Sequence, residues 1–107
     1  MARTVEIALV EPLEGKTRAQ QIARLKEWKK LYLSLGAEKI VITEVGPGNL
    51  NAAWIFSIYH KNATAYGKAV DGYYSNSKGP DAASEKWQKT PVLKFNSFTI
   101  AFEVDDI

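Results

Sequence analysis

The segment 52–60 (AAWIFSIYH) constrains the fold most, because as a strand it carries apolar residues on both of its faces. Successive side chains of a strand point to opposite sides of a sheet. The two sets are Trp54, Phe56 and Ile58 on one face, and Ala53, Ile55 and Tyr59 on the other. Both faces therefore need cover, since monomeric soluble proteins rarely expose a large apolar patch.

Three further segments alternate in the same way and are predicted to be strands. They are 4–10 (TVEIALV), 39–45 (KIVITEV) and 96–104 (NSFTIAFEV). The turn at 46–49 (GPGN) is too short for a crossover, so a hairpin is expected to join 39–45 to 52–60. The segment 11–15 (EPLEG), which contains a proline and a glycine, is expected to break the first strand.

Two helices are predicted between these strands. The first begins at Thr17, where TRAQ fits a capping box, and ends before Gly36, which is placed for a left-handed cap. The second is expected from Asn62 to about Ser75, and a short helical turn from 81 to 88.

The order strand, helix, strand, strand, helix, strand is typical of the α+β ferredoxin-like βαββαβ fold, with two helices on one face of a four-stranded antiparallel sheet. The 107 residues suit a single domain spanning 1–107. Two helices can cover only one sheet face, so we expect a second copy to cover the other as a homodimer. Two such sheets packed together enclose either side chains or one small ligand.

Composition excludes several kinds of chemistry. There is no cysteine and one histidine, His60, which removes disulfides, thiol nucleophiles and the common zinc and iron–sulfur sites, so no metal and no cofactor is predicted. Fourteen basic residues against twelve acidic ones do not favour a nucleic-acid partner, although six basic residues fall within 16–30. With no membrane-length apolar run and no signal-like start, we expect a cytoplasmic protein without a membrane partner.

The segments 54–59 (WIFSIY) and 65–69 (AYGKA), a strand leading into a helix, resemble the dimeric α+β barrel superfamily. That superfamily includes cofactor-independent antibiotic-biosynthesis monooxygenases and the NIPSNAP-like proteins, and the likeness in element order extends over nearly the whole chain. The resemblance implies a small-molecule-binding protein, with a monooxygenase or isomerase acting on an aromatic or polyketide-like compound as the enzymatic form. Members of one fold carry many functions, so the resemblance indicates the fold more than the activity.

Glu6 and His60 are the candidate catalytic residues. His60 is in phase with Trp54 and Phe56, so it lies either in a cavity between the sheets or at its rim. Glu6 lies in the middle of a strand, and it is either a buried general base at the sheet centre or a solvated charge at an edge.

The candidate ligand-binding residues are polar or aromatic groups expected in the same space. They are Thr43, Trp54, Phe56, Ile58, Tyr66 and Thr99. The alternative is a non-catalytic structural or interaction protein, in which these aromatics fill the space and the apolar sheet face only seals a homodimer. A void lined by Glu6 or His60 would favour the ligand-binding interpretation.

Overall fold

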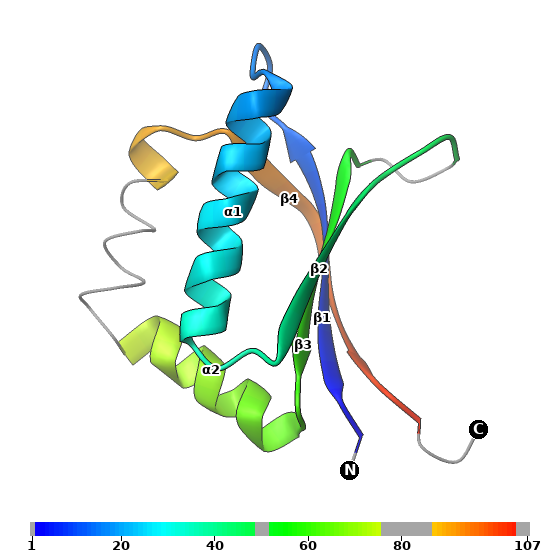
Figure 1. Ribbon diagram of the computed structural model, residues 1–107, viewed down its shortest axis with the longest axis vertical. Coiled ribbons are helices and arrows are strands. Elements are labelled where there is room, and N and C mark those ends of the chain that lie inside the picture. Colours follow the sequence, from blue (N-terminus) through cyan, green and yellow to red (C-terminus); the bar gives the residue numbers. More distant parts are fainter. Residues whose placement is uncertain (1, 49–51, 76–86, 105–107) are drawn as a thin grey trace.

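A computed structural model of the protein describes residues 2–48, 52–75 and 87–104 (Figure 1). The elements are β1 (Thr4–Pro12), α1 (Arg18–Ser34), β2 (Lys39–Glu44), β3 (Trp54–His60), α2 (Ala63–Ser75) and β4 (Leu93–Phe102). This order confirms the predicted ferredoxin-like βαββαβ arrangement. Residues 87–89 are also helical, and the rest of the helical turn expected at 81–88 lies outside the described residues.

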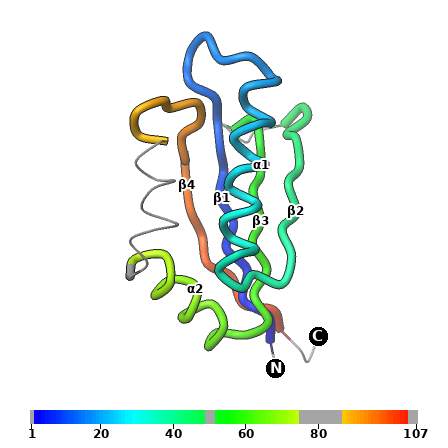
Figure 2. Tube along the Cα trace, turned by 60° about the vertical axis from the view of Figure 1, so that its left-hand side comes forward, coloured from blue at the N-terminus to red at the C-terminus, as the bar shows by residue number. Residues whose placement is uncertain are grey.

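The four strands form one antiparallel sheet in the order β2-β3-β1-β4. The predicted hairpin is confirmed by the pairing of β2 with β3. Both helices lie on the same face of the sheet, with α1 running along the strands and α2 crossing near one end (Figures 1 and 2). The strands β1 and β3 are central, so residues on the helix side of these two strands lie in the middle of the protein.

The two helices begin where capping side chains were expected. The Thr17 Oγ1 accepts a hydrogen bond from the Gln20 N–H at 3.2 Å, and the Gln20 Oε1 accepts one from the Thr17 N–H at 2.8 Å. Gly36 has φ +103°, as the left-handed cap requires. At α2, the Asn62 Oδ1 accepts a hydrogen bond from the Ala65 N–H at 2.9 Å. These bonds satisfy N–H groups that have no partner inside a helix.

The strand β1 continues two residues beyond the predicted segment 4–10 and ends at Pro12, within the segment 11–15 that was expected to break it. Pairing with β3 stops at Val10, whereas pairing with β4 continues to Pro12↔Leu93. Pro12 therefore belongs to a two-stranded ribbon there, in which a missing N–H is tolerated on the unpaired side. The strand β4 also begins earlier than predicted, at Leu93, and ends at Phe102, so Val104 lies beyond it.

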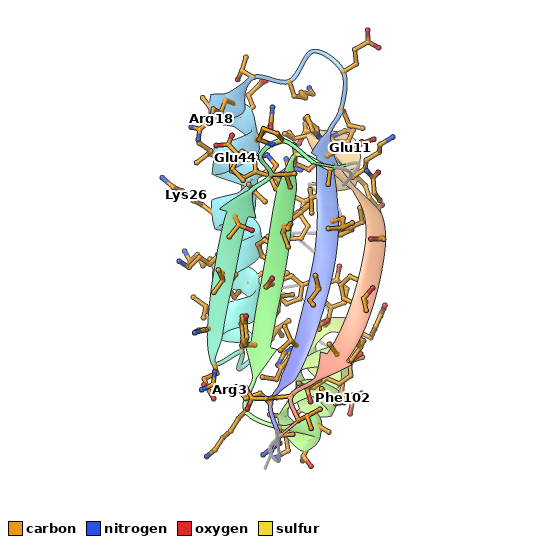
Figure 3. The ribbon with its side chains drawn as sticks, turned by 90° about the vertical axis from the view of Figure 1, so that its right-hand side faces the viewer. Arg3, Glu11, Arg18, Lys26, Glu44 and Phe102 are labelled. Atoms are coloured by element: carbon orange, nitrogen blue, oxygen red, sulfur yellow. The ribbon has the colours of Figure 1, made fainter. Side chains whose placement is uncertain are left out.

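The two faces of β1 and β3 are buried differently. The side covered by the helices is fully buried and consists of Thr4, Glu6, Ala8 and Val10 with Trp54, Phe56, Ile58 and His60. The other side is half-buried and consists of Val5, Ile7 and Leu9 with Ile55, Ser57 and Tyr59. Figure 3 looks onto this uncovered side, which we call the open face. Both faces of β3 are thus apolar, as predicted.

No helix in the described parts of the chain is both long and apolar enough to cross a membrane.

Candidate functional site

A cavity of about 330 Å³ lies between the sheet and the helices. It is formed by β1, α1, α2 and β4 and therefore lies on the covered side of the sheet. Its described lining residues are Glu6, Tyr32, Tyr66, Ala69, Val70, Tyr73, Tyr74, Phe95 and Phe98. A volume of this size is at the lower end of the range for small-molecule sites.

Glu6 is the one carboxylate in the described lining, and it is paired with His60. In the β1–β3 ladder Glu6 lies opposite Ile58, so His60 is its diagonal neighbour on the same face. The Glu6 Oε2 and the His60 Nε2 are 2.5 Å apart, and the two side chains are 8% and 0% exposed. The two side chains meet because β1 and β3 are paired at the centre of the sheet and both residues are buried on its helix-covered face.

His60 lies behind Glu6 as seen from the cavity. It is not among the cavity-lining residues, and its ring packs edge-on against Tyr66 with centroids 5.4 Å apart. Its second nitrogen, Nδ1, is buried and has no hydrogen-bond partner in the described structure. The same is true of the Oγ1 of Thr4, the residue that lies opposite His60 in the β1–β3 ladder. The cavity-facing acid–base group is therefore Glu6.

Tyrosines surround the carboxylate on the helix side. Burial raises the pKa of Tyr32, and the nearby Glu6, Tyr73 and Tyr74 raise it further. The rings of Tyr32 and Tyr73 are parallel within 10° at a centroid distance of 6.5 Å, and Tyr73 meets Tyr74 edge-on at 5.2 Å. Tyr32 is thus a neutral phenol that can donate or accept a hydrogen bond in the cavity.

The opposite wall is apolar and comes from β4. Phe95 and Phe98 meet edge-on at 6.3 Å, and Phe95 also stacks on Trp28 at 4.9 Å. Both β4 rings are 48% exposed, so this wall is near the surface. The cavity thus runs from a buried carboxylate to a partly exposed aromatic wall.

Of the residues proposed from the sequence, Glu6 and Tyr66 line this cavity and His60 contacts both. The remaining aromatic and aliphatic candidates, Trp54, Phe56 and Ile58, are on the same sheet face but belong to the core. Phe56 packs edge-on against Trp28 at 5.8 Å, and the Trp54 Nε1 donates to the Gln21 Oε1 at 2.9 Å.

The expectation that Glu6, His60 and the candidate threonines share a space between two sheets is wrong. The helices cover the face that carries Glu6 and His60, whereas Thr43 and Thr99 lie on the open face, opposite Ile55 and Ile7. Alternation along each strand fixes these groups to opposite sides of the sheet.

Most of the cavity lining was not predicted as a site. Tyr32 belongs to the apolar stripe of α1, and Tyr73 and Val70 to the inner side of α2, where aromatic and aliphatic residues indicate core. Phe98 lies in the predicted strand 96–104, where alternation of apolar residues indicates a strand and not a site. The helix-to-sheet packing that leaves a void between them has no signal in the sequence.

In the described parts of the chain, no group of three or more His, Cys, Asp or Glu side chains is arranged to hold a metal ion.

Comparison with known proteins gives likeness in structure only. No protein-family model matches the chain, and no curated protein matches it significantly. A DABB family protein with a ferredoxin-like fold from Mesorhizobium loti has a TM-score of 0.64 at 12% identity, over 97% of each chain. The chain shares that fold.

Two further solved structures support the same fold. A dimeric ferredoxin-like protein of unknown function from Thermobifida fusca has a TM-score of 0.61 at 13% identity, covering 94% of this chain and 89% of that one. An ethyl tert-butyl ether D (EthD) family protein from Bacillus halodurans has a TM-score of 0.61 at 13% identity, covering 97% and 100%. At these identities the likeness concerns the fold and carries no activity.

Proposed function

We propose that this is a small-molecule-binding protein of the dimeric α+β barrel type, in which each subunit receives an aromatic or polyketide-like compound in its own cavity. The observation that carries this proposal is the position of Glu6, a carboxylate held by His60 at the wall of a cavity of about 330 Å³. A carboxylate in a cavity lined mainly by aromatic side chains is typical of a site that binds or acts on a ligand.

The chemistry that fits this arrangement is proton transfer without a cofactor. Glu6 would accept a proton from a carbon of the bound compound, while a phenol such as that of Tyr66 would orient the compound by a hydrogen bond. Return of the proton to another carbon makes the protein an isomerase. Alternatively, the carbanion of a CH₂ group would form a C–O bond with O₂, and return of the proton from Glu6 would give a hydroperoxide. Loss of the second C–H proton and cleavage of the O–O bond then release water and leave a ketone with one oxygen atom, so the substrate itself supplies both electrons and the protein is a monooxygenase.

A thermal-shift screen against aromatic compounds tests the binding, with a variant that fills the cavity. Val70→Trp places an indole in the cavity, whereas Lys68→Trp places one on the exposed side of α2. A compound that raises the melting temperature of the native protein and of Lys68→Trp, but not of Val70→Trp, supports the proposal. Equal shifts in all three proteins would contradict it.

The open face is the proposed dimer surface. Its central strands present Val5, Ile7, Leu9, Ile55 and Tyr59, all half-buried in the single chain. Charged groups lie toward its edge, where the Lys39 ammonium is 5.0 Å from the Tyr59 ring centre. An apolar centre with a polar rim is the usual composition of a protein interface, and the Thermobifida fusca protein of the same fold is described as dimeric.

The alternative function is non-catalytic, with the open face sealing a homodimer and nothing binding in the cavity. The apolar character of the open face favours it, because a dimer needs no ligand to explain that face. Glu6→Gln and His60→Ala variants that bind and turn over every tested compound as the native protein does would exclude these residues from any catalytic role.

A further inference from the structure

The hydrogen bonds of His60 indicate the charge of the Glu6–His60 pair. A neutral imidazole has one N–H and one acceptor nitrogen, whereas an imidazolium has two N–H groups. The Nε2 faces the Glu6 Oε2, and the buried Nδ1 has no acceptor in the described structure. Because an unpartnered buried N–H is costly, the proton belongs on Nε2 and His60 is neutral. The pair then carries one negative charge, on Glu6.

This charge is not compensated by the rest of the described lining. The other polar lining groups are phenols, and burial together with Glu6 raises the pKa of Tyr32, so that phenol stays neutral. No lysine or arginine is among the described lining residues. Among the described residues, the inner wall therefore presents a carboxylate without a cation beside it.

The rings around the carboxylate add to this negative potential. Aromatic rings carry partial negative charge on their faces and attract cations, most strongly where water is excluded. Six such rings are among the described lining residues, contributed by α1, α2 and β4: Tyr32, Tyr66, Tyr73, Tyr74, Phe95 and Phe98. An anionic ligand would meet Glu6 at close range, with no cation among the described lining residues to offset the repulsion.

We propose that the ligand of this cavity is an amine in its protonated form, carried on an aromatic body. The ammonium group donates to the Glu6 carboxylate, and the body packs against Tyr73 and Phe98. This proposal rests on the proposed function, because the cavity has to hold a ligand, but it does not require turnover.

Three probes with the same ring and nearly the same size separate charge from shape: phenethylamine, phenethyl alcohol and phenylacetate. Isothermal titration of the full chain at neutral pH is expected to show the amine binding about tenfold or more tightly than the alcohol. The acid is expected to bind more weakly than either. If phenylacetate binds as tightly as phenethylamine, or more tightly, the proposal is overturned.

A matched pair of variants locates the charge that is responsible. Glu6→Gln removes the carboxylate that lines the cavity. Glu11→Gln removes a carboxylate of the same strand that lies outside the cavity and forms a salt bridge with the Lys94 ammonium at 2.9 Å. The preference for the amine over the alcohol is expected to disappear in Glu6→Gln and to persist in Glu11→Gln. If Glu6→Gln does not fold, the order of the three probes on the native protein decides.

Failure of this proposal is distinguishable from failure of the proposed function. If amine, alcohol and acid bind equally, and Val70→Trp abolishes all three, the cavity is a ligand site and the proposed preference for a cation is wrong. If none of the three binds, the amine proposal is overturned, and the wider screen of aromatic compounds decides the proposed function.

Discussion

The carboxylate of Glu6 and the imidazole of His60 are 2.5 Å apart, Oε2 to Nε2, on the buried face between the two central strands. Neither side chain has another described acid–base partner at that distance. This contact therefore contributes both to the stability of the protein and to the chemistry of its cavity.

Removal of one member of the pair is expected to destabilise the protein strongly. His60→Ala leaves the Glu6 carboxylate buried without its donor, which costs about 3 kcal/mol or more in the free energy of unfolding. The double variant Glu6→Ala/His60→Ala should lose less than the sum of the two single variants. Urea denaturation of all four proteins measures this coupling, and purely additive losses would show that the pair does not interact.

The covered face of β3 is predicted to carry the core. Phe56 is fully buried and contacts both Trp28 and Tyr32. Phe56→Ala should therefore lower the free energy of unfolding by about 3–5 kcal/mol. Ser57→Ala, at the next residue on the opposite face, is the control and should change it little. A small loss at Phe56 would contradict the assigned packing.

The open face of β3 is predicted to hold the dimer instead. Ile55→Glu places a charge at the centre of that face, opposite Leu9 in the ladder, and should convert the dimer to an 11.9 kDa monomer. Light scattering measures the mass and circular dichroism the fold. Lys61→Glu, an exposed position after β3, should remain dimeric. A native protein that is already monomeric at micromolar concentration would exclude the dimer.

Tyr32 is predicted to resist ionisation in alkaline solution. Burial is the main cause of its raised pKa, and the charge of Glu6 adds to it. A folded-state pKa above the unfolded value near 10 means that the unfolded chain loses this proton first. The resulting stability is complete below about pH 10 and declines as the pH rises further. Ultraviolet titration should therefore show one of the five tyrosines ionising last in the native protein.

The same titration of Tyr32→Phe identifies that group. The late step should be absent from this variant, and the remaining tyrosines should ionise as they do in the native protein. A late step that persists in Tyr32→Phe would assign the buried phenol to another residue.

The fold could be predicted because its signals are local. The TRAQ capping box, Gly36 and the alternation along 52–60 each depend on a few neighbouring residues, and together they give the element order. The sequence also placed His60 in phase with Trp54 and Phe56, but it left Glu6 either buried at the sheet centre or solvated at an edge. It could not show which face the helices cover, since Trp54 and Ile55 are both large and apolar.

The cavity itself depends on contacts between distant segments. Glu6 and His60 meet through the β1–β3 register, across 54 residues, and Tyr32 approaches them only after α1 docks on the sheet. The void further depends on how far α2 lies from β4. No spacing along the chain encodes that distance, so the site was expected between two sheets rather than between sheet and helices.

A crystal structure of the protein with phenethylamine tests the central claim most directly. The account predicts the ligand on the covered side of the sheet, between α2 and β4, with its nitrogen within hydrogen-bond distance of a Glu6 carboxylate oxygen. A ligand bound on the open face, or in the cavity with its nitrogen directed away from Glu6, would contradict it.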